Sequence, residues 1–167
     1  TLCILLFSQF SFAAKERYVG GDHYNTQTGK FFNPAVRKDK DFWDLMKWLT
    51  NRNMSQWPEW VENEASPELP VSLTNHEMAV TFINHSSFLI QFNGINILTD
   101  PVYSERTSPV GFVGPKRVRA PGLPFSRLPK IDFVAISHNH YDHMDIDTLK
   151  KLYKKFKPTF LVPLKDG

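Results

Sequence analysis

Three histidines and one aspartate lie within residues 138–143, which read His-Asn-His-Tyr-Asp-His. An apolar run, residues 133–136, comes directly before Ser137 and this motif. Imidazole nitrogens and carboxylate oxygens are the ligands that zinc and similar divalent ions accept. A single histidine at the end of a strand is usually an ordinary surface or core residue, whereas four candidate ligands in so short a stretch favour a metal site.

The spacing within the motif predicts how these residues divide between ions. If residues 132–137 form a strand, His138 and His140 lie two apart at its carboxyl end, where side chains two apart share a face. They can then chelate one ion together, and Asp142 and His143 can meet a second ion from the turn that follows. Two ions about 3.5–4 Å apart can clamp both oxygens of a displacement reaction.

The surrounding sequence predicts an α/β domain. Residues 78–84, 87–92 and 95–99 have the composition of strands, and Asn93-Gly94 predicts a two-residue hairpin turn because both of its positions favour positive φ.

After the motif, residues 145–156 predict a helix with aspartates near its start and lysines toward its end, an order that suits the helix dipole. The next strand, residues 159–162, should run parallel to residues 132–137 because a helix connects the two. Open α/β sheets place their sites at the carboxyl ends of such strands.

The motif resembles the signature of the metallo-β-lactamase superfamily of hydrolases, His-x-His-x-Asp-His. Residues 78–167 also resemble the N-acylphosphatidylethanolamine-hydrolysing phospholipase D branch of that superfamily, and residues 27–50 resemble it weakly. The closer resemblance is carried by Thr99-Asp100-Pro101, Ser104-Glu105-Arg106, Ser108-Pro109, Gly114-Pro115-Lys116-Arg117, Leu128-Pro129 and the residues from Ile136 to His143.

The resemblance implies the αββα sandwich of the metallo-β-lactamase fold, present as its N-terminal half only. Members of the family are longer and supply further metal ligands from the second half of the fold. We therefore expect a partial signal peptide at residues 1–13, an N-terminal extension with one amphipathic helix at 14–75, and the first half of the domain at 76–167. These residues alone are expected to be inactive.

The resemblance also implies roles at the site. His138 and His140 hold one divalent ion, Asp142 and His143 hold the other, and zinc is the expected metal. Asp142 and Asp100 are the expected catalytic residues, and Asp100 supports the site from behind because a metal-bound imidazole needs an acceptor on its other ring nitrogen. The alternative for Asp100 is an ordinary turn aspartate.

Residues outside the motif are expected to contact the substrate. His85 matches a histidine that precedes the hairpin in the family, and we expect it near the cleft but not as a metal ligand; a surface histidine is the alternative. Residues 101–130 are rich in proline and contain basic side chains but only one acidic residue, Glu105. Lys116, Arg117 and Arg119 are predicted to bind phosphate, because long ordered loops are usually functional; a solvated basic loop is the alternative.

The N-terminal region has two further features. Residues 2–12 are apolar and uncharged, as in a secretory signal, which predicts a secreted or periplasmic protein, either free or associated with a membrane; a buried strand or an uncleaved anchor is the alternative. The only cysteine, Cys3, lies in this stretch, so no internal disulfide is expected. A helix from Asp39 or Asp41 to Asn51 has one apolar face, for packing on the main domain or for binding a partner or membrane surface.

The predicted function is metal-dependent hydrolysis of a phosphodiester, in a substrate similar to N-acylphosphatidylethanolamine, by a water made acidic by the ions. The alternatives are a lactonase or other carbonyl hydrolase that uses the same metal site, and a metal-binding or interaction module without catalysis. A net charge of +3 is too mild to indicate a nucleic-acid partner. The sequence predicts no oligomeric state.

Overall fold

The computed structural model describes residues 21–33, 41–51, 56–71, 73–74, 76–108 and 111–163. The chain divides into two compact units between Trp57 and Pro58. The expected signal segment, residues 1–13, lies outside the described residues. The predicted division at residues 13 and 75 stays a prediction.

The N-terminal unit contains a short hairpin and one helix. Strands β1 (Tyr24–Asn25) and β2 (Lys30–Phe31) pair antiparallel. Helix α2 (Phe42–Asn51) matches the expected amphipathic helix, and none of its residues is buried. Asp41 and Asp44 cap its first turn reciprocally: Asp44 N donates to Asp41 Oδ1 at 2.8 Å, and Asp41 N donates to Asp44 Oδ2 at 3.3 Å. Its packing on the main domain stays a prediction.

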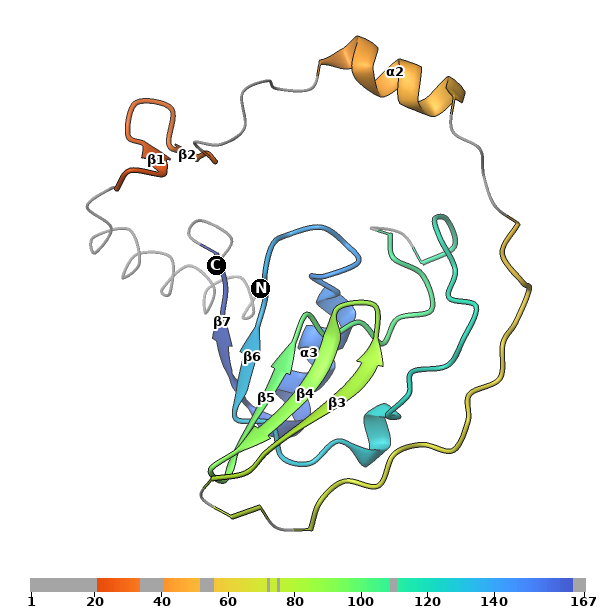
Figure 1. Ribbon diagram of the computed structural model, residues 1–167, viewed down its shortest axis with the longest axis vertical. Helices are drawn as coiled ribbons and strands as arrows, with labels where there is room; N and C mark the ends of the chain where they lie inside the picture. Colours follow the sequence, from red (N-terminus) through yellow and green to blue (C-terminus); the bar gives the residue numbers. More distant parts are fainter. Residues whose placement is uncertain are drawn as a thin grey trace. The chain divides into compact units, whose positions relative to one another are not determined.

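The second unit is built on a five-stranded sheet with the order β3-β4-β5-β6-β7 (Figure 1). The first three strands pair antiparallel, and β5, β6 and β7 pair parallel. This confirms the predicted hairpin and the predicted parallel pair. The strands are β3 (Met78–Asn84), β4 (Ser87–Phe92), β5 (Ile95–Thr99), β6 (Phe133–Ala135) and β7 (Thr159–Leu161).

The turn between β4 and β5 has the conformation that its sequence predicts. Asn93 has φ 53° and Gly94 has φ 76°, and the flanking Phe92 and Ile95 are paired. Positive φ at both central positions gives the turn a twist that matches the twist of the strands. Asn93-Gly94 thereby sets the register of the β4–β5 pair.

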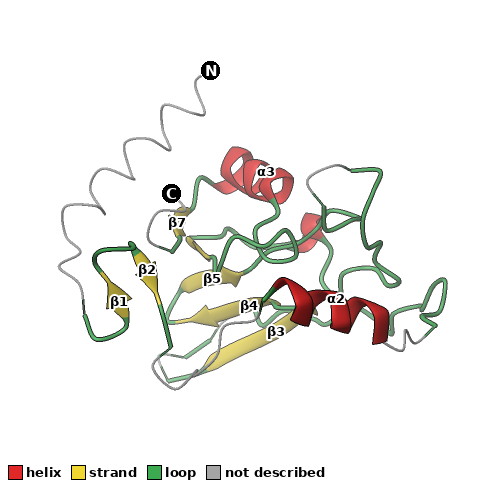
Figure 2. Cartoon of the chain, turned by 90° about the horizontal axis from the view of Figure 1, so that it is seen from above, coloured by secondary structure: helices red, strands yellow, loops and turns green. Residues whose placement is uncertain are grey.

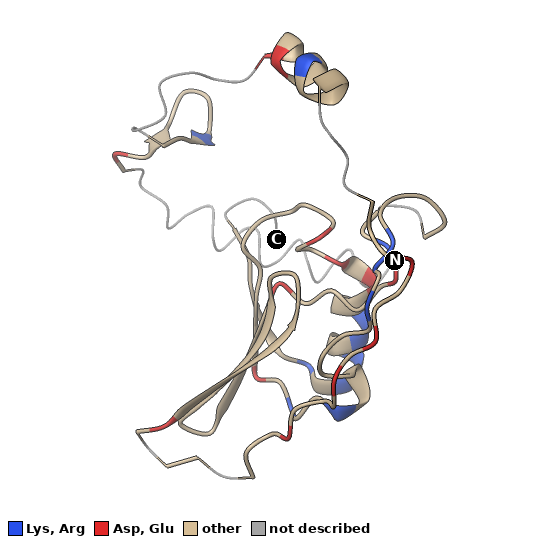
Figure 3. Cartoon of the chain, turned by 45° about the vertical axis from the view of Figure 1, so that its right-hand side comes forward, with Lys and Arg blue, Asp and Glu red and all other residues tan. Residues whose placement is uncertain are grey.

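Helix α3 (Ile146–Phe156) covers one face of this sheet (Figure 2). Asp145 is its N-cap, and basic residues occupy its last turn (Figure 3). The sheet and the helix share a core of buried aliphatic side chains, which include Ile83, Leu89, Leu98, Val134, Leu149 and Leu152. Fully burying one aliphatic side chain contributes about 1.5–3 kcal/mol, so this core is the main stabilising contact of the unit.

The opposite face of the sheet is apolar and exposed. Met78, Val80 and Phe82 alternate along β3 with less exposed residues, and they are 62%, 54% and 57% exposed. The described residues therefore form one sheet and one helical layer of the expected αββα arrangement. Among the described helices, none has the length and apolar character needed to cross a membrane.

Residues 101–130 form the predicted long irregular segment, interrupted by the 3₁₀ helix η1 (Phe125–Arg127). Residues 57–70, a proline-rich stretch that precedes the sheet, hydrogen-bond to this segment. Val61 N donates to Val118 O at 2.7 Å, and Ser66 Oγ donates to Gly122 O at 3.0 Å. These bonds supply acceptors and donors to backbone that has no strand partner, which keeps the segment ordered.

Candidate metal centre

The ligand motif lies in a loop rather than at the end of a strand. Strand β6 ends at Ala135, so the prediction that the strand continues to Ser137 is wrong. The physical reason is that Ser137 N donates to the side chain of Asp100, at 2.7 Å from Oδ1, instead of to a neighbouring strand. The chain then turns, and His140 O accepts from His143 N at 2.9 Å and from Met144 N at 2.7 Å.

His138 and His140 nevertheless form a pair of donor atoms. His138 Nε2 lies 3.0 Å from His140 Nδ1, and the two ring centroids are 4.6 Å apart. His138 is half-buried and His140 is exposed. Tetrahedral zinc with nitrogen ligands at about 2.0–2.1 Å requires donors about 3.3 Å apart, so these two atoms need only a small adjustment to chelate one ion.

Asp142 and His143 form a second donor pair in the same loop. His143 Nε2 lies 3.8 Å from Asp142 Oδ2. The side chain of His143 is 16% exposed, and that of Asp142 is 43% exposed. The two donor pairs are adjacent, because the rings of His138 and His143 have centroids 4.0 Å apart. The structure therefore brings all four motif residues together, and their role as metal ligands stays a prediction.

Asp100 supports this loop from beneath. It follows β5, is 6% exposed, and has a positive φ of 37°. Its Oδ2 accepts from His143 Nδ1 at 2.9 Å and from Ser137 Oγ at 2.7 Å. The buried Ser87 fixes the backbone of Asp100 by donating its hydroxyl to Asp100 O at 2.6 Å.

Hydrogen-bond satisfaction indicates the tautomers of two histidines. His143 donates its Nδ1 proton to Asp100, which leaves the Nε2 lone pair free. Ser137 Oγ has one proton, which goes to Asp100, so its 2.9 Å contact with His138 Nδ1 must be donated by the imidazole. His138 Nε2 then carries the lone pair that can bind a metal. Asp100 thus orients one histidine of each donor pair, directly for His143 and through Ser137 for His138.

The same contacts set the ionisation of Asp100. Burial acts to raise the pKa of this carboxyl, but the hydrogen bonds from His143 and Ser137 outweigh it and hold the pKa below its usual value. Asp100 is therefore a carboxylate at neutral pH, which is the state that can accept these bonds.

His85 joins the centre from the turn between β3 and β4. Its Nε2 lies 3.1 Å from Asp142 Oδ2, and its ring centroid lies 5.0 Å from that of His143. The sequence prediction placed His85 near the cleft, and the structure places it in direct contact with a motif residue. The sequence shows only that His85 lies at the tip of a hairpin, which does not reveal what the tip meets.

Donor atoms of His85, Asp142 and His143 all lie within 4.8 Å of one another. Two imidazoles and a carboxylate, with a further position open to water, are a donor set that catalytic zinc sites use. The residues present therefore fit a metal ion of the zinc type. A metal bound here would be held at the edge of the sheet formed by the ends of β5 and β6 and by the β3–β4 turn (Figure 1).

The basic residues predicted to bind phosphate differ in their surroundings. Arg117 is half-buried and donates to backbone oxygens, with Nε 3.2 Å from Ser104 O and Nη2 3.4 Å from Val102 O. Lys116 Nζ lies 2.8 Å from Glu105 Oε1. Arg119 is exposed. The contacts of Arg117 favour a structural role in the loop, and substrate binding by all three residues stays a prediction.

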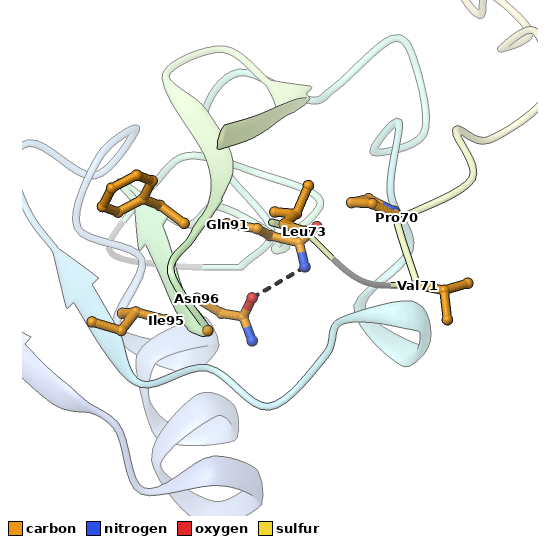
Figure 4. Close-up of a pocket in the computed structure, with 8 residues that line it drawn as sticks. Pro70, Val71, Leu73, Gln91, Ile95 and Asn96 are labelled. Atoms are coloured by element: carbon orange, nitrogen blue, oxygen red, sulfur yellow. Dashed lines mark hydrogen bonds between the residues drawn. The ribbon is translucent and has the colours of Figure 1, made fainter. Parts of the chain in front are cut away.

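A pocket of about 280 Å³ lies at the opposite edge of the sheet, beside the β4–β5 turn (Figure 4). Its lining includes Pro70, Leu73 and Ile95, and Gln91 Nε2 donates to Asn96 Oδ1 at 3.1 Å on its wall. None of the lining residues is acidic, basic or a histidine. The pocket therefore offers no group for acid–base or metal chemistry, and the histidine cluster is the better candidate site.

Residues 79–166, just over half of the chain, match a protein-family model described as the beta-lactamase superfamily domain. The chain therefore belongs to the beta-lactamase superfamily. The sheet order, the covering helix and this membership together define an α/β domain of the metallo-β-lactamase type.

Individual relatives match different lengths of the chain. An uncharacterised protein of Mycobacterium tuberculosis is 38% identical over 160 residues, which cover 93% of this chain and 43% of that protein. N-acyl-phosphatidylethanolamine-hydrolyzing phospholipase D 1 of Caenorhabditis elegans is 42% identical over 72 residues, 43% of this chain and 20% of the relative. The mitochondrial N-acyl-phosphatidylethanolamine-hydrolyzing phospholipase D of Saccharomyces cerevisiae is 35% identical over 87 residues, 50% of this chain and 18% of the relative. The chain spans less than half the length of these relatives.

Proposed function

We propose that the protein is a metal-dependent phosphodiesterase that acts on a phospholipid similar to N-acylphosphatidylethanolamine. The observation that supports it most is the pair of donor sets, His138 with His140 and Asp142 with His143, gathered at one edge of the sheet over a buried carboxylate. The likeness to two phospholipases D that hydrolyse N-acylphosphatidylethanolamine supports the choice of substrate.

In this proposal the chain's residues divide the work. Divalent ions, when bound, would supply an acidified water and stabilise negative charge on phosphoryl oxygens. His138, His140, Asp142 and His143 would hold the ions, and Asp100 would keep the imidazoles of His138 and His143 in the tautomer whose Nε2 carries the lone pair. The side chain of Asp142 is 43% exposed, which leaves an open side beside the ligands for a substrate.

The proposed partner is an amphiphilic substrate at a membrane surface. Arg119 is exposed and can meet a phosphate, and the exposed ring of Phe112 lies in the same loop as an apolar contact for acyl chains. The apolar, uncharged residues 2–12 support a secreted or periplasmic location, where phospholipid would be met from outside the cytoplasm.

A carbonyl hydrolase such as a lactonase is the second candidate, and the contacts of Arg117 favour it. Its guanidinium donates to Ser104 O and Val102 O instead of pointing freely at a phosphate. A metal centre of the same composition can polarise a carbonyl oxygen in place of a phosphoryl oxygen. The two candidates therefore share the metal ligands. They differ in whether the substrate group beside residues 101–130 is a phosphodiester or a carbonyl.

The deciding experiment supplies the zinc-loaded protein with vesicles of N-acylphosphatidylethanolamine and, separately, with a panel of lactones. We expect release of N-acylethanolamine that stops on chelation and in His140→Ala. Metal content should fall together with activity in His138→Ala and Asp142→Ala. Cleavage of lactones without phosphodiester turnover would replace the first candidate by the second.

A further inference from the structure

The outer side of helix α3 carries a cluster of lysines. Leu149 and Leu152 are buried in the core, and the side chains on the opposite side of the helix are exposed. Because residues three and four apart share a helix face, the exposed lysines form one basic strip along α3 (Figure 3). We call this strip the lysine face; it consists of Lys150, Lys151, Lys154 and Lys155, and the C-cap residue Lys157 follows it.

The charge of the lysine face is little neutralised within the fold. Asp147 is the only acidic residue of α3, and its Oδ1 lies 3.8 Å from Lys150 Nζ. Among the described residues, no acidic side chain forms an ion pair with Lys151, Lys154 or Lys157. Helix α3 and its C-cap therefore carry five lysines against one aspartate, whereas the net charge of the whole chain is only +3.

The stability of the helix accounts for only part of this charge. Positive side chains in the last turn suit the helix dipole, which explains Lys154 and Lys155. The dipole acts within one turn of the helix end, so it does not explain Lys150 and Lys151. Lys150 with Lys154 and Lys151 with Lys155 are also like-charge pairs four residues apart, an arrangement that destabilises a helix. Charge that does not serve the fold points to an anionic partner.

The chemistry of the lysine face favours a phospholipid surface over a nucleic acid. Helix α3 contains no arginine, the side chain best suited to bidentate recognition of phosphates and bases. Lysine, a point charge on a flexible stem, suits unspecific attraction to anionic headgroups. Ile146 and Tyr153 lie on the same helix and are 45% and 46% exposed, and tyrosine is enriched where a bilayer meets water.

We propose that the lysine face is the surface through which the protein docks on an anionic phospholipid bilayer. This inference rests on the proposed function for the choice of a lipid partner. Helix α3 begins at Ile146, three residues after His143 of the candidate metal centre. Lys150 lies about 6 Å further along the helix axis. Docking through α3 would therefore hold the candidate metal centre close to the phosphodiesters of the bilayer.

The test compares two double variants that lose the same positive charge. Lys151→Gln with Lys154→Gln changes the lysine face, and Lys30→Gln with Lys130→Gln changes two exposed lysines elsewhere. Binding is measured by sedimentation with vesicles of phosphatidylcholine and phosphatidylglycerol, and with vesicles of phosphatidylcholine alone. One lysine beside an anionic bilayer contributes about fivefold to the affinity, so we expect a loss of about 25-fold in the first variant and of less than about fivefold in the control. High salt should weaken binding of the unmodified protein.

Thermal unfolding shows whether the first variant keeps its fold. Each glutamine removes one like-charge pair and retains high helix propensity, so the melting temperature should not fall. Lys151→Gln alone is the second variant. It should lower the affinity for anionic vesicles by about fivefold, and it decides the question if the double variant is unstable.

The outcomes separate this inference from the proposed function. Equal vesicle binding by the two double variants would overturn the docking surface, and so would binding to double-stranded DNA without binding to anionic vesicles. N-acylphosphatidylethanolamine in detergent micelles tests the proposed function without a bilayer. Unchanged turnover in micelles beside lost vesicle binding would support both proposals. Vesicle binding through these lysines without turnover of either form of the substrate would support the docking surface and overturn the proposed function.

Discussion

Asp100 and Asp145 are the two buried carboxylates in the part of the chain that the structure describes, with 6% and 7% of their surfaces exposed. Asp100 contacts the candidate metal ligand His143 directly. It reaches a second candidate ligand, His138, through the hydroxyl of Ser137. Among the described residues, the hydrogen-bond partners of the Asp145 side chain include no histidine. This side chain accepts from Ser104 N and Ser104 Oγ, both at 2.8 Å, and from Thr148 Oγ1 at 2.6 Å, and so joins the start of the long loop to helix α3.

The difference shows that burial and ionisation do not by themselves identify a functional carboxylate. For Asp145, as for Asp100, burial acts to raise the pKa and hydrogen bonds lower it below the usual value. What distinguishes the two is the chemistry of the donors: backbone amides and hydroxyls around Asp145, an imidazole beside Asp100. One carboxylate joins two segments of the fold, and the other contacts the candidate metal ligands.

The largest expected effect is on stability, from Asp145→Ala. This change removes the cap of α3, leaves the Ser104 amide without its acceptor, and leaves the Tyr103 amide with Thr148 Oγ1 alone. We expect the free energy of unfolding to fall by about 3–4 kcal/mol, measured by urea denaturation. Asp147→Ala is the control, because this aspartate lies in the same helical turn but its side chain is 76% exposed. Equal losses in the two variants would contradict the structural role of Asp145.

The next effect is on metal affinity, from Asp100→Asn. Asparagine keeps the shape of the side chain and tolerates the positive φ, so the fold should persist. Its amide cannot accept from both Ser137 and His143 as the carboxylate does, and we expect zinc affinity to fall about 10–100-fold in competition with a chromogenic chelator. Asp132→Asn, at the opposite end of β6, is the control. If both variants bind zinc equally well, Asp100 does not position the site.

A smaller effect is expected from Ser137→Ala. The hydroxyl links Asp100 to His138, so its removal should lower zinc affinity by about tenfold, at the lower end of the range for an indirect contact. Ser137→Thr retains a hydroxyl and should restore most of the affinity. Identical zinc affinities of the alanine and threonine variants would show that the hydroxyl does not help His138 to bind the metal.

The smallest effects separate two arginines of the long loop. Arg117→Gln should lower the free energy of unfolding by about 1–2 kcal/mol, because two backbone oxygens lose a charged donor. Arg119→Gln should change it by less than about 0.5 kcal/mol, since the side chain is exposed. Binding to anionic vesicles at low salt should weaken in Arg119→Gln through loss of a surface charge. A vesicle defect confined to Arg117→Gln would reverse this assignment.

The sequence by itself determined the local features of the fold. The bounds of β3, β4 and β5, the Asn93-Gly94 turn and helix α3 agree with the predictions, because each depends on residues close together in the chain. The four motif residues were identified in the same way, since their ligand chemistry and spacing lie within one short segment. Alternation, turn preference and helix capping are short-range effects that one sequence displays.

Only the tertiary structure decided which distant groups meet. The length of β6 depended on whether Ser137 N would bond to a strand or to Asp100. The contact of His85 with Asp142 and the burial of Arg117 against the loop's own carbonyls depended on how the β3–β4 hairpin and residues 101–130 are held. Such contacts are fixed by strand register and by hydrogen-bond competition across the fold, and neither quantity is written in the spacing of residues along the chain.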